Sequence, residues 1–182
     1  RHEPYGVVAV ISPWNVPFAI PFTITATAIA AGNAVVLKPS ELTPASGEWV
    51  RRVLEEAGVP SGLVSVVQGE SAVGEALVAE PRVAKVFFTG SVAVGRRVAA
   101  AAGARGCPVV LELGGKDAFV VFADADLDRA VDGALYAAFT GAGQVCVSAE
   151  RIYVERPVHD EFVRRLVAGA KTLRPHEEVS PL

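Results

Sequence analysis

The sequence is poor in the residues that build disulfide frameworks and metal sites, with two cysteines and three histidines among 182 residues. The histidines are His2, His159 and His176, and their positions match no metal-ligand spacing, so we expect no bound metal. Two cysteines are too few for a disulfide framework. We therefore expect Cys107 and Cys146 to be free thiols, and a cytoplasmic location, where thiols stay reduced.

The sequence also lacks methionine, a strong net charge and a long apolar run. Because it begins with arginine rather than methionine, we expect it to be part of a longer protein. The formal net charge of -3 is mild and predicts neither a nucleic-acid partner nor an anionic membrane partner. Residues 18–31 are apolar but include three threonines and a proline, so they are too short and too polar to span a membrane. No secretory signal is visible.

Short β-rich runs alternate with helix-like runs through the first part of the chain. The expected strands are residues 7–12, 34–38, 64–68 and 83–89. The expected helices are residues 21–31, 43–57, 71–79 and 92–102, and Thr43 is a candidate N-cap. This alternation predicts an α/β fold with a Rossmann-like, mostly parallel sheet and helices on both of its faces.

The regular alternation of expected strands and helices ends after Pro108. Strands are expected at residues 109–113, 119–122 and 152–154, and helices at residues 126–139 and 158–173. A Gly114-Gly115 pair interrupts the pattern, so we place a domain boundary there. The chain then consists of a first domain at residues 1–113 and the start of a second α/β domain at residues 114–182.

Three loops that follow expected strands carry polar groups suited to a ligand. Gly90, Ser91 and Gly95 open a helix after a strand, an arrangement that favours phosphate binding but also occurs in ordinary turns. Lys38 and Glu41 could bind the hydroxyls of a ribose, or could be two solvated surface charges. The loop Pro13-Trp14-Asn15 offers an amide that could donate to a developing oxyanion, or it is a loop with a packed tryptophan.

Two further residues form a possible pair for covalent acyl transfer. Cys146 lies in a loop of small residues and could act as a thiol nucleophile, while Glu112 before the Gly-Gly pair could act as a base. The thiol would need a neighbouring base or a helix N-terminus to ionise. The alternative for Cys146 is a small buried apolar cysteine, which is the commoner case for an isolated cysteine.

Together these segments resemble the central part of the NAD(P)-dependent aldehyde dehydrogenase superfamily. The resemblance covers nearly the whole chain and rests on five ordered motifs, which are residues 11–15 (ISPWN), 31–41 (AGNAVVLKPSE), 88–91 (FTGS), 111–116 (LELGGK) and 143–146 (GQVC). It implies that Cys146 is the nucleophile and Glu112 the general base, and that the Asn15 amide and the Cys146 backbone N–H bind the oxyanion.

The resemblance also implies a cofactor site. Lys38 and Glu41 match the contacts to the adenine ribose, and Gly90, Ser91 and Gly95 match the turn near the pyrophosphate. The remaining matches to the cofactor pocket are Pro13, Trp14, Gly69, Gly74 and Leu113. The implied cofactor is NAD, with NADP possible, so residues 1–113 become a partial dinucleotide-binding domain and residues 114–182 the N-terminal part of a catalytic domain.

The implied reaction is the oxidation of a small-molecule aldehyde to a carboxylic acid, with hydride transfer to NAD(P), through a cysteine thiohemiacetal and a thioester. The full-length form is expected to be a homo-oligomer. The chain departs from the family pattern at Ser148, where a smaller residue is usual, and in the tail at residues 173–182. Two alternatives stay open, a CoA-acylating enzyme, against which Glu112 argues, and a non-catalytic or incompletely folded fragment.

Overall fold

The structure is a computed structural model that describes residues 3–174. His2, His176 and most of the expected departure in the tail lie outside the described residues. The chain divides into two compact units, Arg1–Leu113 and Gly114–Leu182, which we treat separately. Both cysteines are free thiols, as expected; Cys107 is buried and Cys146 is exposed.

The first unit is built on a five-stranded sheet in which all neighbouring strands are parallel. Its strands are β1 (Val7–Ile11), β2 (Ala34–Lys38), β3 (Val64–Val66), β4 (Val83–Gly90) and β5 (Val109–Leu113). They lie side by side in the order β3-β2-β1-β4-β5. The expected parallel α/β sheet is confirmed.

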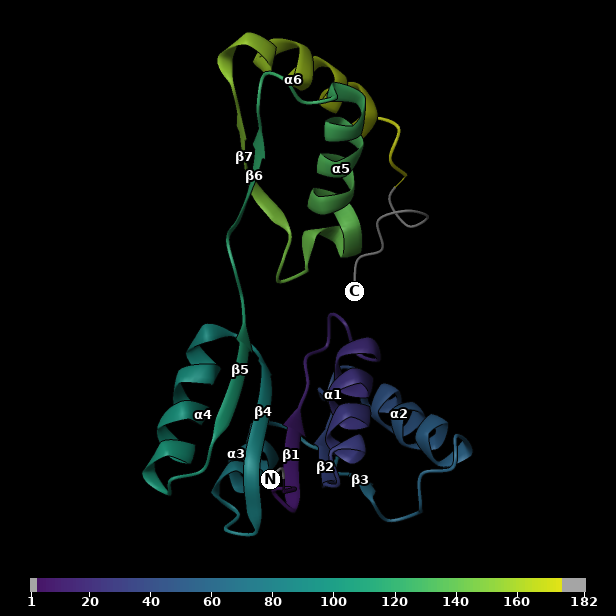
Figure 1. Ribbon diagram of the computed structural model, residues 1–182, viewed down its shortest axis with the longest axis vertical. Helices are drawn as coiled ribbons and strands as arrows, with labels where there is room; N and C mark the ends of the chain where they lie inside the picture. Colours follow the sequence, from purple (N-terminus) through teal and green to yellow (C-terminus); the bar gives the residue numbers. More distant parts are fainter. Residues whose placement is uncertain (1–2, 175–182) are drawn as a thin grey trace. The chain divides into compact units, whose positions relative to one another are not determined.

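Four helices cover the two faces of this sheet (Figure 1). They are α1 (Ala19–Ala30), α2 (Pro44–Glu56), α3 (Ser71–Ala79) and α4 (Val92–Ala104). Val8 and Val10 of β1 pack with α1 and α2 on one face, whereas Ala9 packs with α3 and α4 on the other. Successive side chains of a strand point to opposite faces, which explains why β1 is apolar throughout.

The strand order reverses between β1 and β4. The chain runs outward from β1 through β2 to β3, then crosses back over the sheet by α3 to β4 and continues to β5. The register pairs Ile11 with Phe88 at the carboxyl ends of the two central strands. A reversal of this kind leaves a crevice outside the carboxyl ends, which is where open α/β sheets bind ligands.

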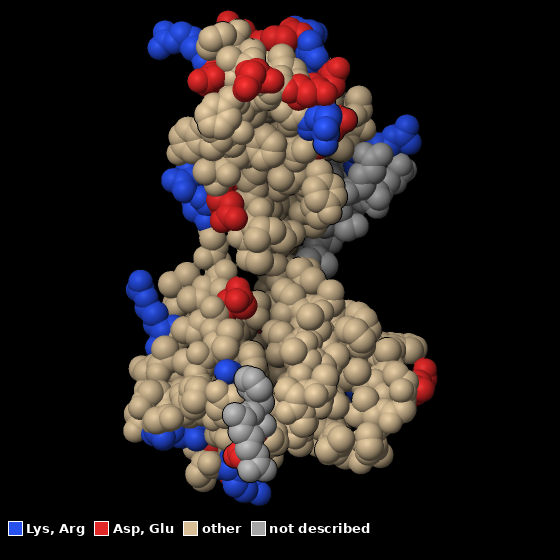
Figure 2. Space-filling model, in the orientation of Figure 1, with Lys and Arg blue, Asp and Glu red and all other residues tan. Residues whose placement is uncertain are grey.

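The second unit has a two-stranded parallel sheet, β6 (Asp117–Val121) and β7 (Ala149–Val154). Helices α5 (Leu127–Phe139) and α6 (Arg156–Ala170) pack on it around the buried Phe162, and a short 3-10 helix, η1 (Thr140–Gly143), follows α5. Charged side chains of both signs gather at the top of Figure 2, where α6 lies in Figure 1. Glu161 on α6 forms ion pairs with Arg164 and Arg165. A second α/β unit is thus present, as expected.

Two local expectations need correction. Thr43 occupies the N-cap position of α2, but its side chain accepts no capping hydrogen bond, and Pro44 occupies the first helical turn instead. Helix α1 begins at Ala19, ahead of the expected residue 21, because proline is tolerated in a first turn. Among the residues described, no helix has the length and apolarity needed to cross a membrane.

Candidate functional site

A pocket of about 390 Å³ lies between α3 and α4, over the carboxyl ends of β1 and β4. Ile11 and Phe88 from the two central strands line it, as does Gly74 from α3. Glu75 and Arg97, one on each helix, also line it, and their charged groups are 3.8 Å apart. The pocket therefore occupies the crevice predicted by the strand reversal, and its mainly apolar lining suits a flat aromatic group.

Lys38 ends β2 close to this pocket. Its side chain is buried, its Nζ donates a hydrogen bond of 3.1 Å to the Pro39 carbonyl, and the exposed Glu41 carboxylate lies 3.7 Å away. A Cβ placed on Gly74 would lie 3.6 Å from Cδ of Lys38, so the lysine stem packs beneath the pocket wall. Lys38 is not a solvated surface charge, and its ammonium group retains donors for a ligand hydroxyl beside the Glu41 acceptor.

The turn between β4 and α4 faces the same carboxyl edge. Ser91 is the N-cap of α4, and its Oγ accepts a hydrogen bond of 3.3 Å from the Val94 backbone N–H. The N-terminus of α4, with its partial positive charge, then favours an anion. Packing favours glycine at position 95, because a Cβ there would lie 2.5 Å from Cδ2 of Leu113. Packing favours glycine at position 90 as well, because a Cβ there would lie 2.7 Å from Cζ of the Phe88 ring.

Several of the sequence-predicted cofactor residues lie near the crevice without lining the pocket. Gly69 precedes α3 with a φ of +143°, and a Cβ there would lie 2.4 Å from Cγ2 of Val73, so backbone conformation and packing both require glycine. Pro13 and Trp14 follow β1, and Trp14 is 37% exposed. Of the residues expected to bind a cofactor, Gly74 lines the pocket itself.

The sequence reading missed other residues that line the pocket. Val94, Val98 and Ala101 of α4 face it at helical spacing. Such an apolar stripe is visible in a sequence, but it is the same pattern that any core-facing helix shows.

Asn15 and Glu112 are the two expected catalytic residues of the first unit. Asn15 is half-buried in the loop between β1 and α1, and Glu112 is exposed on β5. Glu112 lies beside Thr89 in the register of β4 and β5. Both residues thus follow or end strands of the central sheet at the edge where the crevice opens.

Cys146 lies in the second unit, in the loop between η1 and β7. Gly141, Ala142 and Gly143 precede it with φ values of 60°, 58° and 74°, so three successive residues adopt the left-handed region, including one with a side chain. The thiol-bearing residue is exposed, so the alternative of a small buried cysteine is wrong. A left-handed backbone conformation at a residue with a side chain, as at Ala142, costs free energy, and such conformations cluster at functional sites.

Gly115 explains part of how this loop is positioned. A Cβ on Gly115 would lie 2.8 Å from the carbonyl oxygen of Cys146, closer than side-chain carbons approach a backbone atom. The backbone at Gly115 therefore passes directly against the Cys146 carbonyl. The neighbouring Gly114 has nothing within 4 Å of the same position. In the sequence this pair indicates a boundary and belongs to a family motif, but it does not indicate this contact.

Comparison with known proteins agrees with these motifs. The profile described as "Aldehyde dehydrogenase family" matches residues 1–181. The chain is 41% identical to an aldehyde dehydrogenase from Brucella melitensis biovar abortus, with a TM-score of 0.92 over 98% of this chain and 37% of that one. The chain belongs to the aldehyde dehydrogenase family.

Two further solved structures are similar to this chain. An NADP dependent enzyme from E. coli is 42% identical, with a TM-score of 0.93 over 98% of this chain and 37% of that one. PnpE, which comes from a Pseudomonas species, was solved in complex with nicotinamide adenine dinucleotide and is 42% identical, with a TM-score of 0.89 and the same coverage. The chain spans little more than a third of the length of these structures.

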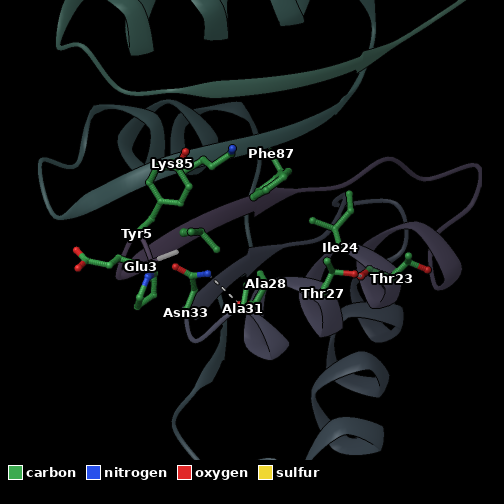
Figure 3. A pocket seen from close by; sticks show the side chains of 12 residues that line it. Glu3, Tyr5, Thr23, Ile24, Thr27, Ala28, Ala31, Asn33, Lys85 and Phe87 are labelled. Carbon is green, nitrogen blue, oxygen red and sulfur yellow. Dashed lines mark hydrogen bonds between the residues drawn. The ribbon is translucent and has the colours of Figure 1, made fainter. Parts of the chain in front are cut away.

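A second pocket, about 520 Å³, lies on the opposite face of the sheet beside α1 (Figure 3). The Lys85 ammonium there lies 4.7 Å from the Tyr5 ring centroid and 5.2 Å from that of Phe87. None of the expected site residues lines it. Within the described part of the chain, no group of three or more potential metal ligands is present.

Proposed function

We propose that the full-length protein containing this chain oxidises an aldehyde to a carboxylic acid, with NAD(P) as hydride acceptor. The observation that carries the proposal is an exposed cysteine, Cys146, at the motif position of the nucleophile in a chain that matches the family over residues 1–181. A cytoplasmic location and a homo-oligomeric full-length form are further parts of this proposal, resting on the free thiols and on the family resemblance respectively.

The crevice of the first unit fits a dinucleotide. The pocket between α3 and α4 has the size and apolar lining for an adenine ring, and Lys38 with Glu41 can bind ribose hydroxyls beside it. The N-terminus of α4, capped by Ser91, can face the pyrophosphate. When bound, the cofactor supplies a hydride acceptor.

We propose NAD in preference to NADP because of Glu41. A carboxylate accepts hydrogen bonds from ribose hydroxyls but repels a 2′-phosphate. Lys38, 3.7 Å away, offsets part of this repulsion, so use of both cofactors is compatible with the site. The similar structures include one named as NADP dependent and one solved with NAD, so the family context alone does not decide.

In the proposed cycle, the Cys146 thiolate attacks the aldehyde carbon and forms a thiohemiacetal. The Asn15 side-chain amide and the Cys146 backbone N–H donate to its oxyanion. Loss of a hydride from the thiohemiacetal carbon leaves a thioester on the Cys146 sulfur, and a cofactor held by the first unit would accept that hydride. Glu112 then removes a proton from a water molecule while the water oxygen adds to the thioester carbon. The Cys146 thiolate leaves as the carboxylic acid forms.

The test compares Cys146→Ala with Cys107→Ala in the full-length protein, using NADH absorbance with a panel of aldehydes. Cys146→Ala should abolish oxidation and retain cofactor binding, because the change removes the nucleophile alone. Cys107, buried in the first unit, provides a matched thiol that should be dispensable for the chemistry. Inactivation by Cys107→Ala together with an active Cys146→Ala variant would refute the assignment.

The same preparation separates the two alternatives. A CoA-acylating enzyme would form acyl-CoA and would depend on added CoA for turnover, whereas Glu112 favours water as the acyl acceptor. A non-catalytic chain would form no NADH with any aldehyde. Assaying residues 1–182 alone beside the full-length protein, with a far-UV folding check, shows whether this portion is active without the rest.

A further inference from the structure

Lys85 lies on a face of the sheet where the fold favours apolar side chains. The register pairs Val8 with Lys85 and Val10 with Phe87, and paired residues of adjacent strands point to the same face. Val8 and Val10 belong to the core on the α1 side, so Lys85 and Phe87 point to that side as well. Inner strands of a parallel sheet are normally apolar on both faces. The half-buried Lys85 is thus an exception that the packing of the sheet does not explain.

The second pocket, of about 520 Å³, lies beside this lysine. Figure 3 shows Lys85, Phe87 and Tyr5 on one side of it and Thr23 and Thr27 of α1 on the other. The apolar residues that complete the lining are Pro4, Val8, Ile24, Ala28 and Ala31. A pocket of this size with a mainly apolar lining and few polar groups is typical of small-molecule sites.

The charge of Lys85 is not neutralised within the pocket. Its Nζ lies 4.7 Å from the Tyr5 ring centroid and 5.2 Å from that of Phe87. Contacts with aromatic rings are attractive, but they leave the positive charge in place and N–H donors available. Lys85 forms no ion pair with any of residues 3–174. Glu3 also lines the pocket, but its carboxylate points away from Lys85 in Figure 3.

Other polar groups of the pocket already have partners. The Asn33 side chain accepts a hydrogen bond of 3.1 Å from the Gly6 N–H and donates one of 3.0 Å to the Ala28 carbonyl. These bonds hold the chain before β1 against the end of α1, so Asn33 shapes the wall. The Thr27 hydroxyl donates to the Thr23 carbonyl at 2.7 Å. Lys85 is therefore the group best placed to recognise a ligand.

The charge and the lining together indicate the class of ligand. One ammonium group matches one negative charge. Thr27 and Ala28 belong to the last turn of α1, where the partial negative charge of the helix end disfavours a doubly charged anion. The apolar lining requires an apolar body. We propose that this pocket binds a carboxylate with an alkyl or aryl body, and that Lys85 donates to the carboxylate.

This site is separate from the proposed cofactor site. The pocket between α3 and α4 lies on the opposite face of the same sheet, and the two pockets share no lining residue. The acid formed in the proposed reaction belongs to the same chemical class. The proposal nevertheless stands on the pocket alone, and a binding experiment tests it whether or not aldehyde oxidation is found.

Calorimetric titration of the full-length protein with octanoate tests the site. Lys85→Met keeps an apolar stem but removes the charge, and it should weaken octanoate binding on the order of tenfold, the effect of one partly exposed hydrogen bond between charged groups. Lys85→Arg keeps the charge and should retain binding. Lys171→Met is the matched control, because Lys171 is an exposed lysine after α6 in the other unit, and it should leave binding unchanged.

Two further probes separate the contribution of the charge from that of the apolar body. 1-Octanol has the same chain without the charge, so it should bind no more weakly to Lys85→Met than to the wild type. Octyl phosphate carries roughly two negative charges at neutral pH and should bind no more tightly than octanoate. Saturating NAD should leave the Lys85-dependent binding of octanoate in place, because the two pockets are separate.

Each outcome decides the proposal. Equal octanoate affinity in the wild type and Lys85→Met overturns it, as does displacement of octanoate by NAD. No binding to the full-length wild type, the result expected if the rest of the protein covers the pocket, also overturns it. Tighter Lys85-dependent binding of octyl phosphate refutes the carboxylate as the ligand.

A second variant keeps the test available if Lys85→Met does not fold. Thr27→Trp fills the pocket from the exposed side of α1 and leaves Lys85 in place, so it should abolish the binding of octanoate and of 1-octanol alike. Unchanged octanoate binding in Thr27→Trp overturns the proposal. NADH formation from aldehydes, measured on the same proteins, tests the proposed function independently and should be unchanged in Lys85→Met.

Discussion

Replacing Gly115 by alanine should displace the residue that carries the proposed nucleophile. The added Cβ would lie 2.8 Å from the Cys146 carbonyl oxygen and 2.5 Å from Oδ1 of Asp117. The aspartate side chain can rotate away, but the carbonyl is backbone. Carbon and oxygen atoms in close contact are normally about 3.3 Å apart or more, so the loop must move by about 0.5 Å.

A displacement of that size is enough to reduce turnover. A misplacement of about 1 Å at a reacting group can lower the rate on the order of 10²-fold, so about half that distance should cost roughly tenfold. We expect kcat for aldehyde oxidation to fall by that factor, with a parallel fall in the rate of Cys146 alkylation by iodoacetamide. Cys107 is buried and should contribute little background.

Gly114→Ala is the control for this change, because its Cβ would meet nothing within 4 Å. Both substitutions replace one glycine of the Gly114-Gly115 pair, so they lower the conformational entropy of the unfolded chain to the same degree. A Gly115→Ala protein that is folded, as judged by thermal denaturation, and as active as Gly114→Ala would refute the argument that this close approach positions the cysteine.

Three other predictions follow from the site and the fold. Glu41→Ser should raise kcat/KM for NADP relative to NAD on the order of tenfold, because it removes repulsion of about 1 kcal/mol per phosphate charge at 4 Å in water; an unchanged ratio would count against Glu41 as the selective group. Asn15→Ala should lower kcat on the order of 10²–10³-fold, and a loss limited to NAD affinity in calorimetry would instead place Asn15 in the cofactor site. The pKa of Glu161 is lowered to about 2 by hydrogen bonds from Arg164 and then Arg165, so its stabilising pairs are complete above the ordinary value of 4.5 and are lost as pH falls toward 2. Thermal unfolding measured across that range should therefore be less pH-dependent in Glu161→Gln, although water screens this exposed carboxylate.

Most of the first unit was predictable from local patterns. Apolar runs bounded by glycine and proline predicted the strands, and their alternation with helices predicted a parallel sheet, which the register of β1 with β2 and β4 confirms. The order of the strands was not predictable in this way. It depends on pairings between distant residues, and no local pattern determines on which side of β1 the strand β4 will lie.

The site was predictable in its polar members and less so in its walls. Lys38 and Glu41 stand out through the family motif, because their position alone fits two solvated surface charges; the structure places their charged groups 3.7 Å apart and buries Lys38. Ile11 and Phe88 look like core residues in the sequence, and their place in the pocket follows only from the reversal of the sheet. The contact of Gly115 with the Cys146 carbonyl is likewise tertiary, so a glycine alone could not indicate it.

The central position of β1 orders the assembly of the crevice during synthesis. β1 pairs with β2 through Val7 and Ala34, a short separation that a nascent chain closes early. Its other edge pairs with β4, where Val7 meets Val83, so that edge stays open while three helices and two strands are made. Until β4 is made, this edge of β1 lacks its partner strand, and an unpaired apolar strand edge can associate with other chains. The ligand crevice and the protection of that edge arise in the same step.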